Sequence, residues 1–341
     1  MTKRKLNRRQ QWRIEKIQQE RRHRAERKQA RTVDETLTDS ALGEEQEGLV
    51  IANFGATLEL ETRDGLEVRC QLRQNMPLLV VGDRVVWQPA GEGGVVTALL
   101  ERRSQLARPD AQGELKALAA NIDQILVVAA PAPLYSQDLI NQYLAAAELT
   151  GISPLLVFNK IDLIDGQNRK QVDDLLSIYQ RIGYPVITAS TRREHGLDTL
   201  IGQLKGHTSV FVGQSGVGKS SLVKALLPET SISVGDLSAR SGLGQHTTST
   251  ARLYHLPAGG QIIDSPGVRE FRLWPMSRQA LAQGFVEFRP YLGQCKFRDC
   301  SHQHEPGCAL LEAVVNGEIS RQRLESYHKI AQQLDEYESV Y

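Results

Sequence analysis

One stretch near the middle of the 341-residue chain limits what the chain can fold into. Residues 208–221 read Thr-Ser-Val-Phe-Val-Gly-Gln-Ser-Gly-Val-Gly-Lys-Ser-Ser, an apolar run that ends in the pattern G-x-x-x-x-G-K-[ST]. A helical pattern follows and stops at Pro228. A strand, a glycine-rich loop and a helix in this order point backbone N–H groups at an anion, and the helix N-terminus adds partial positive charge. The stretch predicts a phosphate-binding loop in an α/β domain.

The loop also predicts roles for single residues. We expect Lys219 to reach the β- and γ-phosphates of a nucleotide, and Ser220 to ligate Mg²⁺. The other loop positions are expected to surround the phosphates: Gly213, Gln214, Ser215, Gly216, Val217, Gly218 and Ser221.

A second motif indicates which base is bound. Residues 154–158 are a buried-strand pattern, and Asn159-Lys160-Ile161-Asp162 follows as N-K-x-D. The Asp162 carboxylate can accept hydrogen bonds from N1–H and N2–H₂ of guanine, whereas adenine would leave it unpaired. Asn159 can bond guanine N7 and tie its loop to the phosphate loop, and the stem of Lys160 can lie along the base. The motif therefore predicts guanine selection.

Three further segments fit the same chemistry. Ala189-Ser190-Thr191 is a loose match to the S-A-x loop whose backbone contacts guanine O6. Asp264-Ser265-Pro266-Gly267 is D-x-x-G after an apolar run, so Asp264 is expected to hold Mg²⁺ and Gly267 to bring its N–H near the γ-phosphate. Residues 231–250 are expected to form a mobile loop, in which Thr247 or Thr248 closes over Mg²⁺. We favour Thr248.

The order of these motifs is unusual. A standard GTPase runs from phosphate loop to switch threonine, D-x-x-G, N-K-x-D and S-A-x, whereas here N-K-x-D and Ser190 precede the phosphate loop. The parts are the same but circularly permuted, which a sheet tolerates because chain termini often lie close together. The chain then leaves the D-x-x-G segment directly into its C-terminal region, so a nucleotide-driven shift there could move that region.

The first hundred residues differ from the rest in charge and pattern. Residues 1–31 hold thirteen Lys/Arg and three Glu, a net charge of +10, against −9 for the remaining residues. We interpret them as a nucleic-acid-binding arm, with a solubilising tail as the alternative. Five short strand patterns between Gly48 and Glu101 predict a small barrel. An OB-fold fits best, and an SH3-like barrel or a purely structural β-module is the alternative. We interpret residues 102–120 as a connector.

Cysteines cluster near the C-terminus. Cys295, Cys300 and Cys308, with His302 or the competing His304, suit a closed structural Cys₃His zinc site. Helices are expected at residues 309–315 and 321–337. Four cysteines in all give no disulfide framework, which favours a cytosolic compartment.

With these motifs in hand, residues 48–341 closely resemble the ribosome small-subunit-dependent GTPase A (RsgA, or YjeQ-like) family. The motifs that carry the resemblance are Gly-Gln-Ser-Gly-Val-Gly-Lys-Ser, Asn-Lys-Ile-Asp, Gly-Gln-His-Thr-Thr, Asp-Ser-Pro-Gly-Val-Arg-Glu-Phe and Cys-x₄-Cys-x-His-x₅-Cys. The resemblance implies an OB-fold domain, GTP hydrolysis stimulated by the 30S subunit, and a role in its late maturation. It also implies zinc ligands Cys295, Cys300, His302 and Cys308.

Val268 stands where many GTPases have a water-orienting glutamine. Because valine cannot orient water, intrinsic hydrolysis should be slow, with activation supplied by a partner or another side chain. His246 in the expected mobile loop is our candidate for positioning the water, and the alternative is that it is an ordinary loop residue. The expected catalytic residues are His246, Lys219 and Thr248.

The sequence thus predicts four segments: an arm and linker (1–47), an OB-fold barrel (48–105), a circularly permuted GTPase domain (106–274) and a helical zinc-binding domain (275–341). The expected cofactors are GTP/GDP, Mg²⁺ and one structural Zn²⁺, and the expected partners are the 30S subunit and its 16S rRNA. No apolar run approaches the length of a membrane span, so no contact with a membrane is expected. We also expect the protein to be cytoplasmic and to act as a monomer. The rivals are a GTP/GDP switch with a non-ribosomal partner and, more weakly, a P-loop kinase.

Overall fold

The computed structural model describes residues 42–73, 76–109, 114–227, 251–269, 271 and 273–338. The chain divides into two compact units, the first ending at Glu101 apart from residues 80–82, and the second formed by residues 80–82 and everything from Arg102 on. The expected GTPase and zinc-binding segments fall in one unit, so the boundary between them stays a prediction.

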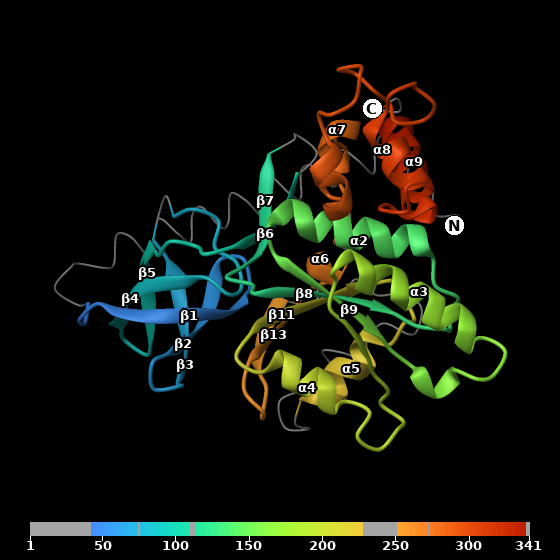
Figure 1. Cartoon of the computed structure of the whole chain (residues 1–341). Helices are drawn as coiled ribbons and strands as arrows, with labels where there is room; N and C mark the ends of the chain where they lie inside the picture. Colours follow the sequence, from blue (N-terminus) through green and yellow to red (C-terminus); the bar gives the residue numbers. More distant parts are fainter. Residues whose placement is uncertain are drawn as a thin grey trace, which may run out of the picture. The chain divides into compact units, whose positions relative to one another are not determined.

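The first unit contains a closed five-stranded barrel (Figure 1). Its strands are β1 (Gln46–Asn53), β2 (Thr57–Thr62), β3 (Glu67–Leu72), β4 (Arg84–Ala90) and β5 (Gly93–Leu99). They pair in the order β1-β2-β3-β5-β4, and β4 pairs back onto β1. Alternate strand residues point inward and form the core together with Leu79 from the segment between β3 and β4: Val50, Leu58, Leu60, Cys70, Val85, Trp87 and Val96. The expected OB-like barrel is confirmed, and Cys70 is a core residue, with its pKa raised to about 12 by burial.

The second unit is built on a six-stranded sheet. Its strands are β8 (Gln124–Ala129), β9 (Ser153–Phe158), β10 (Val186–Thr188), β11 (Thr208–Gly213), β12 (Ala251–His255) and β13 (Gln261–Asp264). They lie in the order β10-β9-β8-β11-β13-β12, parallel except for β12. Because the strands are parallel and in register, the loops that leave the ends of β9, β11 and β13 meet at one edge of the sheet.

Helices cover both faces of this sheet. The helices α2 (Gln137–Thr150) and α3 (Arg169–Ile182) lie on one face, and α4 (Asp198–Leu204) and α5 (Lys219–Leu226) lie on the other (Figure 1). The ends of α2 follow its sequence: Ser136 Oγ accepts a hydrogen bond from Leu139 N at the start, and Gly151 ends the helix at φ 71°. Each helix in the described part of the chain is too short or too polar to span a bilayer.

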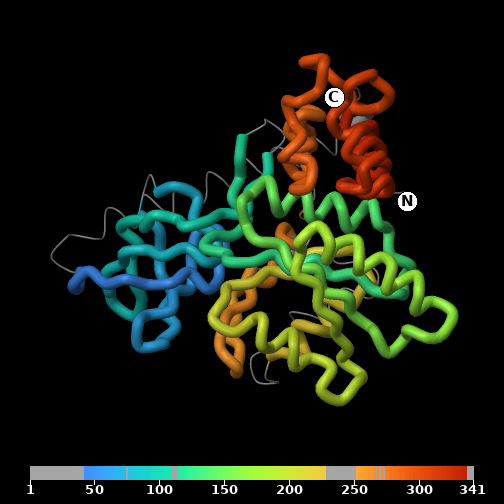
Figure 2. Tube along the Cα trace, viewed as in Figure 1, coloured from blue at the N-terminus to red at the C-terminus, as the bar shows by residue number. Residues whose placement is uncertain are grey.

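The C-terminal helical module comprises α7 (Arg278–Gln283), the 3₁₀ helix η4 (Val286–Tyr291), α8 (Ala309–Val315) and α9 (Arg321–Glu338). Its core includes Phe285 and Phe288, whose rings stack 4.9 Å apart, and Tyr327 packs edge-on against both. The module packs against α2, and Figure 2 shows the red C-terminal segments lying beside that green helix. The expected helices at 309–315 and 321–337 are present.

A buried polar network joins this module to α2. The Arg323 side chain is 1% exposed and donates to both carboxylate oxygens of Glu287, at 2.6 and 3.0 Å. It also donates to Asn141 Oδ1 at 2.6 Å, and that oxygen accepts a second hydrogen bond from Tyr179 Oη at 2.9 Å. Asn141 Nδ2 in turn donates to Ser326 Oγ at 2.8 Å. The network therefore links α2, α3, η4 and α9.

The interpretation of residues 102–120 as a connector is wrong. Residues Gln105–Pro109 (β6) and Leu115–Ala120 (β7) pair as an antiparallel hairpin with a bulge between Leu106 and Ala107. Alanine has low strand propensity, so the Ala-rich run gave no strand pattern. Tertiary packing overrides that preference, since Ala119 and Ala120 are fully buried and Ala120 N donates to Val81 O at 3.0 Å.

Candidate functional site

The phosphate-loop pattern lies between β11 and α5, as the chemistry requires. Gly213 and Gly218 have φ of +139° and +100°. A Cβ at Gly213 would lie 2.3 Å from Val128 O, and one at Gly218 would lie 2.4 Å from Asn159 Nδ2, so only glycine fits at both positions. Lys219 Nζ folds over the loop and donates to Gly213 O at 2.6 Å and Gln214 O at 2.8 Å. A glycine-rich loop that leads into the N-terminus of a helix, with a lysine ammonium beside it, fits a nucleotide phosphate.

The N-K-x-D segment is tied directly to this loop. Asn159 is 2% exposed, and its Nδ2 donates to Val217 O at 2.9 Å. Lys160, at φ 58°, donates from Nζ to Gly216 O and to Ala132 O, both at 2.7 Å. The Asn159 amide has a second N–H for a base acceptor, and its buried Oδ1 accepts no hydrogen bond from the described residues. This arrangement fits a base bound beside the phosphate loop.

Asp162 is oriented by the segment that follows β10. It belongs to the 3₁₀ helix η2 (Ile161–Leu163), and its Oδ1 accepts from the fully buried Ser190 Oγ at 2.6 Å. This hydrogen bond lowers the pKa of Asp162, with smaller contributions from Arg192 and Arg193. The carboxylate therefore stays ionised with oxygen lone pairs left for base N–H donors. The weak Ala189-Ser190-Thr191 match thus marks a segment in direct contact with the N-K-x-D motif.

The D-x-x-G segment leaves the neighbouring strand. Asp264 ends β13, which runs parallel to β11 with Val210 opposite Ile263. The short helix α6 (Pro266–Arg269) follows, and Val268 in it is 1% exposed. A buried aliphatic side chain cannot orient a water molecule. His246, Thr247 and Thr248 lie outside the described residues.

The predicted metal ligands come together in the C-terminal module. The ligand atoms of Cys295, Cys300, His302 and Cys308 all lie within 4.8 Å of one another. His302 Nδ1 lies 3.5 Å from Cys295 Sγ and 3.3 Å from Cys308 Sγ. His304 is exposed and is not part of the cluster. Three thiols and one imidazole at this spacing fit a tetrahedral metal site.

A carboxylate that sequence reasoning did not single out shapes the same loop. Glu305 accepts hydrogen bonds from Ser301 Oγ and from the backbone N–H groups of Ser301, Gln303 and His304. The Ser301 hydroxyl is the largest of the causes that hold the pKa of Glu305 well below its usual range. In the sequence, the only sign of this role is that Glu305 follows Cys300-x-His302 by a few residues. That sign is weak, because many exposed glutamates do not organise a loop.

The sheet order, the joined motifs and their position in the chain define a circularly permuted GTPase. The guanine-type loop follows β9 and the phosphate loop follows β11, yet the two meet in space. The chain belongs to the RsgA GTPase family, whose model matches residues 99–274.

Relatives and solved structures agree with this assignment. The chain is 55% identical over 337 residues to the small ribosomal subunit biogenesis GTPase RsgA of Pseudomonas aeruginosa strain LESB58, covering 98% of this chain and 99% of that one. It is 54% identical to the protein of that name from Azotobacter vinelandii, over 99% of this chain and 100% of that one. The crystal structure of YjeQ from Thermotoga maritima superposes with TM-score 0.70 and 33% identity, covering 85% and 99% of the chains. The crystal structure of YloQ, described as a circularly permuted GTPase, superposes with TM-score 0.69 and 26% identity, covering 86% of this chain and 96% of that chain.

Proposed function

We propose that this GTPase acts on the small (30S) ribosomal subunit during late-stage maturation and that the subunit stimulates GTP hydrolysis. The observation that carries the proposal is the 55% identity to a small ribosomal subunit biogenesis GTPase over nearly the whole of both chains. A match of this length includes the barrel and the C-terminal module, which a shared GTPase domain alone would not require.

We further propose the residues that bind the nucleotide. Asp162 and Asn159 select guanine, Ser190 orients Asp162, and Lys160 braces the phosphate loop from the side. The phosphates lie in the loop Gly213–Ser221, within reach of Lys219 and of Gly267. Ser220, Asp264 and Thr248 are the proposed ligands of Mg²⁺, which when bound would neutralise charge on the β- and γ-phosphates.

We propose that His246 positions the attacking water. The buried Val268 side chain has no polar atom to offer, so the attacking water needs another group to orient it, from this chain or from the partner. His246 directly precedes Thr247 and Thr248 in the sequence, and Thr248 is the residue proposed to reach Mg²⁺. We propose that contact with the subunit brings His246 to the γ-phosphate, which would make hydrolysis partner-dependent.

The Cys₃His cluster is proposed to hold one structural Zn²⁺. Four protein ligands would fill the tetrahedral coordination of the ion, which would leave no open position for catalysis. Zinc binding would stabilise the loop between η4 and α8.

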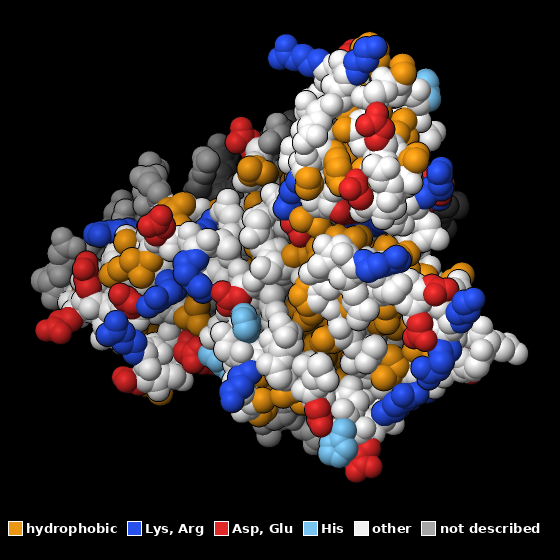
Figure 3. All heavy atoms as spheres, in the orientation of Figure 1, with side chains coloured by type: hydrophobic (Ala, Val, Ile, Leu, Met, Phe, Trp, Pro, Cys, Tyr) orange, Lys and Arg blue, Asp and Glu red, His pale blue; other side chains and the backbone are white. Residues whose placement is uncertain are grey.

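We propose that the arm, the barrel and the zinc-binding module contact 16S rRNA. On the face drawn in Figure 3, Lys and Arg side chains are interspersed with Asp and Glu, so the described surface there has no large single-sign patch. Thirteen Lys/Arg in residues 1–31 supply the concentrated positive charge that a polyanion attracts. We expect the protein to act as a cytoplasmic monomer.

Depletion of the protein in cells tests the proposal. Free small subunits with incomplete maturation should accumulate in sucrose gradients, and the wild-type chain should restore the normal profile. Lys219→Ala should fail to do so, because it removes the cation at the phosphates. Normal small-subunit profiles in depleted cells would instead favour a GTP/GDP switch with a non-ribosomal partner.

A further inference from the structure

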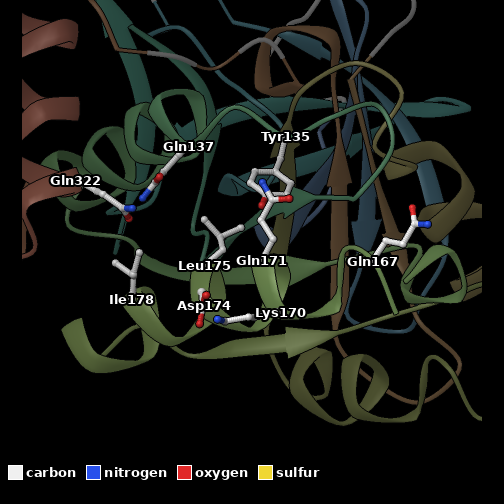
Figure 4. Close-up of a pocket in the computed structure, with 9 residues that line it drawn as sticks. All are labelled: Tyr135, Gln137, Gln167, Lys170, Gln171, Asp174, Leu175, Ile178 and Gln322. Atoms are coloured by element: carbon white, nitrogen blue, oxygen red, sulfur yellow. The ribbon is translucent and has the colours of Figure 1, made fainter. Parts of the chain in front are cut away.

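Apart from the proposed nucleotide site, a polar pocket lies between α2, α3 and the first turn of α9. It has a volume of about 460 Å³, within the range of about 300–1,000 Å³ typical of small-molecule sites. Figure 4 draws Gln137 and Gln322 at one end of it, Gln167 at the other, and Tyr135 between them. The residues that line it come from α2, α3 and α9 and from the segments that precede α2 and α3, so an occupant could touch all three helices.

The floor and the rim of this pocket differ in character. Leu175 and Ile178 are 5% and 9% exposed and provide an apolar floor. On the same face of α3, Lys170, Gln171 and Asp174 are exposed and form part of the rim. A flat ligand with an apolar face and polar edges matches this distribution.

The glutamine amides of the pocket suit a ligand whose edge carries both hydrogen-bond donors and acceptors. Gln137, Gln171 and Gln322 each carry a donor and an acceptor on one planar group. Gln137 Nε2 is buried and has no hydrogen-bond partner among the described residues, so a donor at the pocket is unused. Glutamine pairs with adenine through its N6 and N7 atoms in this two-point manner.

The charged and aromatic groups extend the match beyond the base. Tyr135 is half-buried, and burial raises its pKa, so the ring stays neutral and suits stacking against a base. Lys170 can neutralise one phosphate, and the Asp174 carboxylate can accept from ribose hydroxyls. Asp174 also disfavours a simple multivalent anion.

We propose that this pocket binds one adenine nucleotide unit, with the base over Leu175 and Ile178, between Tyr135 and the glutamine amides. The unit is either a free nucleotide or a nucleotide of single-stranded RNA. The site is separate from the guanine site, although Tyr135 connects the two regions: its ring packs edge-on against Phe158, the residue before Asn159, with ring centroids 5.9 Å apart.

The test uses the full chain saturated with GDP and Mg²⁺, so that the guanine site is filled. AMP and a single-stranded oligoriboadenylate are titrated against CMP and an oligoribocytidylate by calorimetry. The wild type should bind at least one adenine probe and prefer it to its cytosine counterpart. Binding of AMP would assign a free nucleotide, whereas binding of the oligonucleotide alone would assign RNA.

Variants locate the binding. Gln171→Ala combined with Gln322→Ala should weaken the adenine probe at least about tenfold, because each two-point amide contact contributes about 1–3 kcal/mol of base discrimination. Gln180→Ala, an exposed glutamine of the same helix outside the pocket, should leave the affinity unchanged. Equal affinity in all three proteins, equal binding of cytosine probes, or no binding by the wild type would overturn the proposal.

Discussion

At the scale of single residues, the guanine specificity proposed here depends on a hydroxyl as well as a carboxylate. Ser190 is fully buried and donates to Asp162 Oδ1 at 2.6 Å. The hydrogen bond fixes the direction of the carboxylate and lowers its pKa. The carboxylate that we propose recognises the base is therefore already oriented before a nucleotide binds, which reduces the ordering that binding requires.

Two substitutions separate these roles. Asp162→Asn should lower GTP affinity roughly a hundredfold or more, because hydrogen bonds to a charged group contribute about 1.5–3 kcal/mol each. Ser190→Ala should cost less, since the carboxylate remains but its orientation is lost. Fluorescent GTP titration measures both. Full affinity in Asp162→Asn would contradict the proposed base contact.

The pH dependence of binding follows from the same hydrogen bond. A lowered pKa keeps Asp162 ionised below the ordinary aspartate value of about 3.9, so titration of Asp162 should contribute no change in GTP affinity between about pH 7 and about pH 5. In Ser190→Ala the pKa should rise, and the acid loss of affinity should begin at higher pH than in the wild type. If GTP affinity falls at the same pH in both proteins, the hydrogen bond from Ser190 is not the cause of the lowered pKa of Asp162.

His246 is tested through hydrolysis rather than binding. His246→Ala should reduce subunit-stimulated turnover roughly a hundredfold, the lower range for a positioned proton-transfer or water-orienting side chain, and leave GTP affinity unchanged. His255→Ala provides a matched control on the exposed end of β12. Undiminished stimulated turnover in His246→Ala would remove this residue from the mechanism.

At the scale of elements, the contact between α2 and α9 combines apolar packing with a buried charge pair. Arg323 and Glu287 lie in different helical segments and meet against Asn141 of α2. Breaking a buried pair leaves an uncompensated charge, which costs about 3–5 kcal/mol. The network should therefore hold the C-terminal module in one position on α2.

Arg323→Ala should reduce hydrogen-exchange protection of α9 by about 3–5 kcal/mol. Arg321→Ala, an exposed arginine of the same helix, should change it by no more than about 0.5 kcal/mol. Equal protection in the two variants would show that the buried pair contributes little to the packing of α9.

The two histidines of the cysteine loop give a matched pair for the metal proposal. His302→Ala should reduce bound zinc from about one ion per chain to nearly none, whereas His304→Ala should retain it, because His304 lies outside the cluster. Elemental analysis of the purified proteins measures this. Loss of zinc in His304→Ala alone would reassign the ligand.

Much of this element structure could be predicted from the sequence, but not all of it. Leu324, Tyr327, Ala331 and Leu334 follow helical spacing, and all four are buried as that pattern predicts. Arg323 beside them gives no local sign of burial, because its partner Glu287 lies 36 residues away. The β6–β7 hairpin was missed since alanines carry weak strand signals.

The candidate site was more predictable than the packing. The phosphate loop and N-K-x-D depend on residue types at fixed spacing, and the sheet then brings the two together. The brace from Lys160 to Gly216 O depends on how two distant loops meet, which spacing alone does not reveal.

At the scale of the whole molecule, circular permutation changes which segment follows the proposed nucleotide site: the chain runs from the barrel through the GTPase domain and leaves the D-x-x-G segment directly into the C-terminal helical module. The C-terminal module follows α6 in sequence and also packs against α2, whose start lies close to the guanine loop through Tyr135 and Phe158. A change at the nucleotide could therefore reach the module both along the chain and across the α2 contact.

The rate of GTP hydrolysis with and without purified 30S subunits shows whether this chain is a GTPase that the small subunit activates. Because Val268 cannot position water, we predict slow intrinsic turnover and an increase of about tenfold or more with 30S subunits, with no such increase for 50S subunits. Equal rates with and without 30S subunits would contradict it.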